Sequence, residues 1–253
     1  MKPYAFFLDL DGTLVSGGVV PGENMDAIKE AQKRGHFVLI NTGRSYAGIE
    51  KEILNSADFD GVVAALGADI RIHGEQVYLK RLSFDVAETL VDLFCAIPEQ
   101  NLYLSGENAL FVTNPKFASD QHIVIRSLDE YRKLYAHEPV NKFTATIQPD
   151  KDALGIIVSE CNLYYHAQAL EGTVAGCSKA TGMAIAAEKL GVPMERCVAI
   201  GDGKNDVDVL SSAGIAVVMG NHDDGMEQYA DFITDTAENA GVGKAILKLI
   251  EEN

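Results

Sequence analysis

The sequence predicts an α/β fold, in which a parallel sheet is flanked by helices and a smaller α+β domain is inserted. Short apolar runs alternate with helix-length amphipathic segments at both ends of the 253-residue chain, which is typical of βαβ units. Between the two ends the pattern changes to short strand candidates and two helix candidates, which is typical of an α+β domain. The expected boundaries are 1–82 for the first part of the core, 83–175 for the inserted domain and 176–253 for the second part of the core.

The first part of the core follows a regular alternation. Short apolar runs predict strands, and longer segments with apolar residues at helical spacing predict helices. The expected elements are a strand at 5–11, a helix at 24–35, a strand at 36–44, a helix at 45–57, a strand at 61–68 and a hairpin at 68–82 with its turn at 73–75.

The inserted domain and the second part of the core are interpreted in the same way. In the inserted domain we expect helices at 84–97 and 128–137, and strands at 101–106, 109–114, 143–148, 154–160 and 163–172. The βα alternation then returns, with a helix at 179–191, a strand at 196–203, a helix at 205–214, a strand at 215–220 and a closing helix at 242–253.

The composition excludes several classes of partner. The chain carries 37 acidic against 21 basic residues, a formal net charge of −16, whereas phosphate backbones are bound through clustered Lys and Arg, so we expect no nucleic-acid partner. The four cysteines form no CxxC pair, which argues against a zinc ribbon or a disulfide framework. No stretch approaches the roughly 18 apolar residues of a transmembrane helix, and the amino terminus lacks a signal-peptide pattern. We therefore expect a cytoplasmic monomer or homodimer with no membrane partner.

The apolar run Ala5–Leu8 ends in two carboxylates, Asp9 and Asp11. Side chains two residues apart in a strand point to the same face, so the two carboxylates could converge. Two like charges so close are tolerable if a cation lies between them, if one carboxyl is protonated, or if the pair is splayed into solvent.

Polar clusters end three of the predicted strands, at 9–13, 41–44 and 201–206, and Lys179 begins a predicted helix. Because ligands bind beyond the carboxyl ends of the strands of an open parallel sheet, these clusters are expected at the edge where ligands bind. Each alone is more typical of a strand exit, a helix cap or a solvated lysine. Together they supply groups that handle a phosphoryl group with a divalent cation, namely Asp9, Asp11, Thr42, Lys179, Asp202 and Asp206.

The order and separation of these clusters resemble the haloacid dehalogenase superfamily of phosphohydrolases, in particular its Cof-type branch. DLDGT at 9–13 matches the first motif, NTGR at 41–44 the second, SKATG at 178–182 the third and GDGKND at 201–206 the fourth. The resemblance spans nearly the whole chain. It implies a Rossmann-like core with a cap domain inserted between the second and third motifs.

The resemblance also implies a role for each matching residue. Asp9 is expected to be the nucleophile that forms an aspartyl-phosphate, and Asp11 the acid that protonates the leaving oxygen and later activates water. Thr42 is expected to hydrogen-bond the phosphoryl group, and Lys179 to neutralise its charge and hold Asp9. One metal-bound and one metal-distal carboxylate would separate the two pKa values in the direction that these roles need.

A magnesium ion is implied by the same resemblance. Its expected ligands are Asp9, Asp202 and the backbone carbonyl of Asp11, while Asp206 either ligates the ion directly or orients its waters or Lys179. Substrate contacts are expected from Thr42, Gly43, Arg44, Lys179 and Asn205. Arg44 could equally reach a substrate anion or pair with a surface carboxylate.

Departures from the family pattern fall outside the proposed catalytic groups. Leu66 stands where Asn is usual, Ala180 where Gly is common and Val209 where Met is frequent. Leu66 could alter how the pocket wall meets the substrate. In the cap, Tyr164, Tyr165 and His166 are the first candidates for leaving-group contacts.

The expected function is a Mg²⁺-dependent phosphatase that hydrolyses small phosphorylated metabolites, with sugar phosphates as the substrates that the resemblance favours. One alternative is a phosphomutase, which would return the phosphoryl group to a sugar rather than to water. Another is a sensor that binds a phosphorylated ligand without turnover, against which the intact set of catalytic residues argues.

Overall fold

The computed structural model describes residues 2–97, 99–146, 159–165 and 169–252, and the description is of these residues. They form two compact units. The core unit comprises Met1–Gly43, Ile49–Tyr78 and Ser178–Asn253, and the inserted unit comprises Arg44–Gly48 and Leu79–Cys177.

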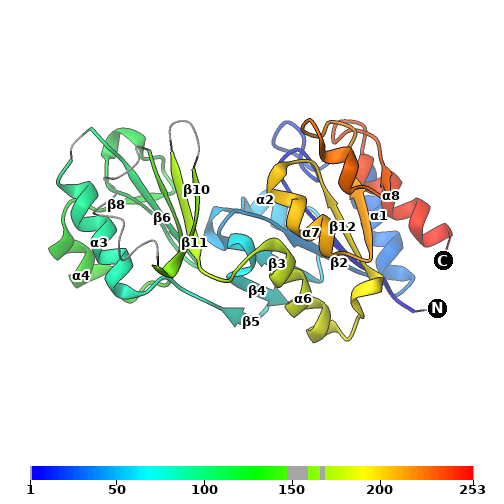
Figure 1. Ribbon diagram of the computed structural model, residues 1–253, viewed down its shortest axis with the longest axis horizontal. Coiled ribbons are helices and arrows are strands. Elements are labelled where there is room, and N and C mark those ends of the chain that lie inside the picture. The colour runs from blue at the N-terminus through cyan, green and yellow to red at the C-terminus, as the bar shows by residue number, and fades with distance from the viewer. Residues whose placement is uncertain (1, 98, 147–158, 166–168, 253) are drawn as a thin grey trace. The chain divides into compact units, whose positions relative to one another are not determined.

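The core unit is built on one sheet, whose strands among the described residues are β1 (Ala5–Leu8), β2 (Phe37–Asn41), β3 (Gly61–Ala64), β4 (Asp69–Ile72), β5 (Glu75–Leu79), β12 (Cys197–Gly201), β13 (Ile215–Val218) and β14 (Phe232–Ile233). Their order across the sheet is β14-β13-β12-β1-β2-β3-β4-β5 (Figure 1). Neighbours from β14 to β3 are parallel, and β4 is antiparallel to β3. The carboxyl ends of the parallel strands therefore lie at one edge.

Helices cover both faces of this sheet; they are α1 (Gly22–Lys33), α2 (Lys51–Leu54), α6 (Lys179–Leu190), α7 (Val207–Ser212) and α8 (Gly241–Glu251). Phe7 and Leu39 pack into one buried cluster with Met183 of α6, and α7 lies beside α6. The alternate strand residues Phe6 and Ile40 are buried on the other face, where α1 and α8 lie side by side (Figure 1). Burial on both faces explains the nearly continuous apolar runs of the parallel strands.

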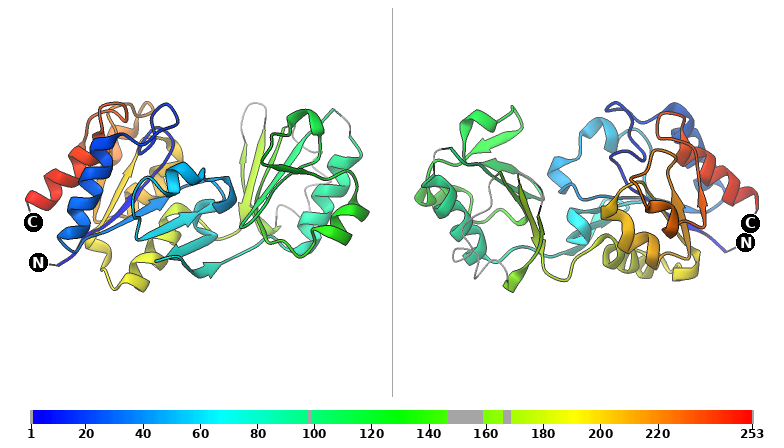
Figure 2. Two further views of the ribbon diagram at one scale, coloured as in Figure 1. Left: turned by 180° about the vertical axis from the view of Figure 1, so that it is seen from behind. Right: turned by 45° about the horizontal axis from the view of Figure 1, so that its top comes forward.

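The inserted unit contains a second sheet, with the strands β6 (Leu102–Gly106), β7 (Leu110–Val112), β8 (His122–Val124), β9 (Val140–Ala145), β10 (Cys161–Tyr165) and β11 (Leu170–Val174). Their order is β10-β11-β9-β6-β7-β8, and the pairs are antiparallel except for β7 with β8. The helices α3 (Phe84–Cys95) and α4 (Leu128–Leu134) pack against each other beside this sheet (Figure 2). Ser83 and Ser127 cap them, each accepting a hydrogen bond from the backbone N–H three residues on.

The predicted fold class is confirmed, but individual elements differ from the sequence-based expectation. The strand expected at 163–172 is instead the hairpin of β10 and β11, in which Tyr165 pairs with Leu170. Between these two residues the sequence has no Gly, Pro, Asn or Asp, so the usual turn signal is absent. Residues 154–158 and 166–168, which include most of one expected strand and His166, lie outside the described residues.

The helix expected at 45–57 is also shorter than its pattern predicts. The chain forms a 3₁₀ turn at Tyr46–Gly48, becomes extended at Glu50 and forms only the single-turn helix α2. Gly48 within the segment weakens its helix propensity. Among the described residues, no helix combines the length and the apolar character needed to cross a bilayer.

Candidate active site

Three of the predicted site residues directly follow parallel strands of the core sheet. Asp9 follows β1, Thr42 follows β2 and Asp202 follows β12. Leu8 pairs with Ile40 on one side and with Ile200 on the other, so Thr42 and Asp202 lie one position beyond the level of Asp9. This edge is where open α/β sheets bind their ligands.

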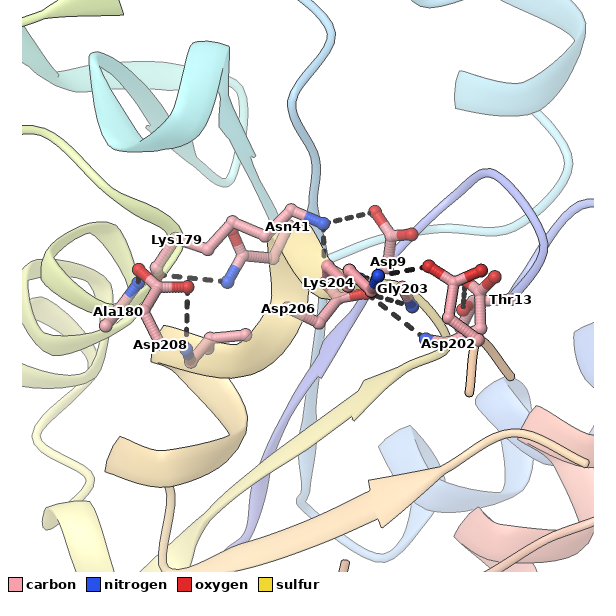
Figure 3. Close-up of polar contacts among 12 residues, drawn as sticks. Asp9, Thr13, Asn41, Lys179, Ala180, Asp202, Gly203, Lys204, Asp206 and Asp208 are labelled. Atoms are coloured by element: carbon pink, nitrogen blue, oxygen red, sulfur yellow. Dashed lines mark hydrogen bonds and ion pairs between the residues drawn. The ribbon is translucent and has the colours of Figure 1, made fainter. Parts of the chain in front are cut away.

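Lys179 is the buried cation of the site. It is the first residue of α6, and the preceding Ser178 forms a reciprocal capping box with Thr181. Its ammonium nitrogen lies 2.6 Å from Oδ1 of Asp9 and 2.6 Å from Oδ1 of Asp206, and none of its side chain is exposed (Figure 3). A buried ammonium is tolerated because two carboxylates share it.

Asp206 uses both carboxylate oxygens within the protein. Oδ1 contacts Lys179, while Oδ2 accepts hydrogen bonds from the backbone N–H groups of Asp202 at 3.1 Å and Gly203 at 3.2 Å (Figure 3). The Asp206 carboxylate therefore links the helix that carries Lys179 to the loop that carries Asp202.

The loop of the first motif packs tightly against Asp202. Oγ1 of Thr13 donates to Oδ1 of Asp202 at 2.8 Å. Gly12 has a φ of +79°, and a β-carbon there would overlap the Asp202 carboxylate, so only glycine fits. Nδ2 of Asn221 donates to the Gly12 carbonyl at 2.8 Å, and its Oδ1 accepts from the backbone N–H of Ala237.

The electrostatics of the cluster favour a cation. Oxygens of Asp9, Asp202 and Asp206 lie within 4.8 Å of one another. Burial raises the pKa of Asp9 to about 7, although Lys179 opposes this shift, and burial also raises the pKa of Asp202. Burial alone would lower the pKa of Lys179, but Asp9 and Asp206 hold it above its ordinary value.

The net charge and the donor atoms of the cluster both suit a divalent metal ion. Three carboxylates against one ammonium leave two negative charges, which one divalent cation neutralises. Carboxylate oxygens are also the ligands that hard divalent cations prefer. The donor set therefore fits such an ion, with Asp9 and Asp202 better placed as ligands than Asp206, whose oxygens are already hydrogen-bonded.

The remaining predicted residues lie around this cluster. Thr42 is buried, whereas Asp11 and Asn205 are exposed, and Gly43 is half-buried. The Asp11 side chain is not part of the carboxylate cluster formed by the described residues. Half-buried Arg44 belongs to the segment Arg44–Gly48, which groups with the inserted unit.

Sequence reasoning missed three residues that hold the site together. Thr13 lies within the first motif without an expected role, although its hydroxyl can donate to a neighbouring carboxylate. Asn41 donates from Nδ2 to the Lys179 carbonyl at 3.2 Å, and Asn221 bonds Gly12 across 209 residues of chain. No local pattern predicts the partners of Asn41 or Asn221.

Comparisons with known proteins agree with this arrangement. Residues 6–246 match the family model of haloacid dehalogenase-like hydrolases. The chain is 31% identical over 256 residues to the 5-amino-6-(5-phospho-D-ribitylamino)uracil phosphatase YcsE of Bacillus subtilis, covering 94% of this chain and 92% of that protein.

Solved structures show the same fold. The phosphatase BT1666 from Bacteroides thetaiotaomicron superposes with a TM-score of 0.80 at 25% identity, covering 98% of this chain and 95% of the other. The subclass IIB sugar phosphatase BT4131 superposes with a TM-score of 0.79 at 24% identity, covering 98% and 99%.

Proposed function

Because the chain belongs to the haloacid dehalogenase-like hydrolase family, we propose that it is a Mg²⁺-dependent phosphatase of small sugar or polyol phosphates. The observation that carries the proposal is the buried Lys179 ammonium between Asp9 and Asp206. The similarity to YcsE, whose name gives a substrate with a phosphorylated ribityl chain, supports a polyhydroxylated leaving group.

In the proposed first step, a carboxylate oxygen of Asp9 attacks phosphorus. The bond from phosphorus to the leaving oxygen breaks, and Asp11 donates its proton to that oxygen. Lys179 fixes the Asp9 carboxylate through Oδ1 and offsets the negative charge of the phosphoryl oxygens. Thr42 supplies a hydroxyl that binds one of these oxygens.

In the second step, Asp11 removes a proton from water as the water oxygen attacks phosphorus, and the bond between Asp9 and phosphorus breaks. Orthophosphate leaves and Asp9 is regenerated. Mg²⁺ held by Asp9, Asp202 and the Asp11 carbonyl would supply charge neutralisation between the nucleophile and the phosphoryl oxygens. In this proposal Gly43, Arg44 and Asn205 contact the substrate, and the inserted domain at 83–175 sets leaving-group preference.

The test is phosphate release from sugar phosphates, polyol phosphates and nucleotides, with Mg²⁺ or with EDTA. We expect release by the wild type with Mg²⁺ and none by Asp9→Asn, which cannot form the covalent intermediate. Asp26→Asn makes the same chemical change on the exposed face of α1 and should retain full activity. Full activity of Asp9→Asn would contradict the covalent mechanism.

The same panel separates the alternatives. A phosphomutase would convert one sugar phosphate into its isomer and would be activated by a bisphosphate. A sensor would bind a phosphorylated ligand without releasing phosphate. Either result, in place of metal-dependent release, would overturn the phosphatase proposal.

A further inference from the structure

The turn Ala65–Gly67, which follows β3, has an unusual backbone. Three consecutive residues adopt positive φ angles, 49° at Ala65, 52° at Leu66 and 85° at Gly67. Only glycine takes this conformation without cost, and strained residues of other types persist where surrounding contacts hold them, often beside functional sites. The segments that contact this turn therefore indicate which part of the structure depends on its strained backbone.

One side of the turn holds the segment that carries Thr42. The backbone N–H of Thr42 donates to the Val63 carbonyl at 2.8 Å, and the Thr42 carbonyl accepts from the N–H of Leu66 at 3.1 Å. Cδ2 of Leu66 would lie 3.6 Å from a β-carbon built on Gly43. Both backbone groups of Thr42 are thus fixed by β3 and the turn.

The other side of the turn lies against the start of α6. A β-carbon on Gly67 would overlap the carbonyl oxygen of Ser178, and it would lie 3.1 Å from the Cα of Gly182. From the opposite direction, a β-carbon on Gly182 would overlap Cγ1 of Val63 and lie 2.8 Å from the Cα of Gly67. Gly67 meets Ser178 and Gly182 backbone against backbone, so this part of the contact cannot adjust by rotation of a side chain, whereas the overlap of a Gly182 β-carbon with Val63 is with a side-chain atom.

Ser178 and Gly182 flank Lys179 in the first turn of α6, so this contact sets the position of the Lys179 backbone. We propose that the turn Ala65–Gly67 is a positioning element that fixes the spacing between Thr42 and Lys179, the two side chains assigned to the phosphoryl group. The proposal rests on the proposed function. It makes Gly67 and Gly182 positioning residues, since neither offers a side chain to the substrate.

The main test adds one methyl group to each side of the contact. Gly67→Ala and Gly182→Ala should each push α6 away from the turn. We expect kcat to fall about 10- to 100-fold, since misplacement by about 1 Å can cost 100-fold. The inhibition constant for orthophosphate should rise, because both phosphoryl-binding groups bind the product. The double variant should lose less than the product of the two single losses, because both changes act on one contact.

Gly191→Ala is the matched control. Gly191 ends the same helix with a φ of +67°, but a β-carbon there would meet nothing within 4 Å. This variant shares the backbone strain of Gly67→Ala without its overlap, and it should keep the wild-type kcat and phosphate affinity. All assays are made well below the melting temperature of each variant.

Leu66→Ala provides a variant without added bulk, since it keeps the β-carbon and removes the buried side-chain atoms that lie beside Gly43. It should also weaken orthophosphate binding, measured by calorimetry. The inference would be overturned if folded Gly67→Ala, Gly182→Ala and Leu66→Ala kept the wild-type kcat and orthophosphate affinity. It would also be overturned if Gly191→Ala lost as much kcat and affinity as these variants. Absence of phosphate release by the wild type would overturn the proposed function instead, and orthophosphate binding to the same variants would still decide the inference.

Discussion

Lys179 and Lys244 each lie 2.6 Å from a carboxylate oxygen, but they differ in burial. The Lys179 side chain is fully buried, whereas that of Lys244 is 56% exposed beside Asp235. Lys179→Met leaves Asp9 and Asp206 buried without their cation, so the free energy of unfolding should fall by about 3–5 kcal/mol. Urea unfolding in EDTA at pH 7 measures this loss.

Lys244→Met is the control for this prediction, because it removes an ion pair of the same length from an exposed position. Its unfolding midpoint should hardly change, since solvent screens exposed pairs. Equal losses of stability in the two variants would show that burial does not determine the strength of these ion pairs.

The residue types of the site could be predicted from the sequence, but their contacts could not. Asp9, Lys179 and Asp202 stand in motifs whose order is readable along the chain. The bond from Thr13 to Asp202 spans 189 residues and the bond from Asn221 to Gly12 spans 209. Such pairs depend on which strands become neighbours in the sheet, and no local periodicity encodes that order.

At the scale of the element, the cap of α6 has a consequence for activity as well as stability. Ser178→Ala removes the side-chain acceptor for the N–H of Thr181, which should cost about 1 kcal/mol of stability. Because Lys179 is the next residue, the same change should also lower kcat. Denaturant unfolding and steady-state kinetics measure the two effects.

Ser127→Ala removes the matching cap of α4 in the inserted unit. A similar loss of stability is expected there, with kcat unchanged, because α4 carries none of the proposed catalytic residues. If both variants kept the wild-type kcat, the cap of α6 would have a structural role alone.

Helices and strands could be predicted where the hydrophobic pattern was long and where capping or turn residues marked both ends. α6 fits both conditions, with a serine cap and a glycine end. The sequence predicts one strand where β10 and β11 form a hairpin, because the segment between Tyr165 and Leu170 contains no typical turn residue. β14 is not predicted, since a strand of two residues is too short to show an alternating pattern. β8 is not predicted either, whereas β7, also of three residues, falls within the strand expected at 109–114.

At the scale of the whole molecule, the buried carboxylates link folding to pH. Burial raises the pKa of Asp9 from 3.8 to about 7. A carboxyl with a raised pKa binds its proton more tightly in the folded state than in the unfolded state. Its contribution to stability is therefore fully present below pH 3.8 and is lost as the pH rises to about 7.

Asp9→Asn abolishes this titration and leaves Lys179 paired with Asp206. In EDTA, the difference in unfolding free energy between Asp9→Asn and the wild type should therefore grow in favour of the variant between about pH 4 and pH 7, and then level off. Urea unfolding across this range measures it, with Asp26→Asn as the control that should follow the wild type. A difference that stays constant with pH would contradict the raised pKa.

Mg²⁺ should narrow the difference in unfolding free energy between Asp9→Asn and the wild type at pH 8. An ion that binds only the folded state adds about 2.7 kcal/mol at 100 times its dissociation constant, and the wild type should gain this. Asp9→Asn has one carboxylate fewer and should gain much less, so the advantage of the variant should be smaller with Mg²⁺ than in EDTA. Equal gains would mean that Asp9 is not a metal ligand, and the charge balance of the cluster would then need another explanation.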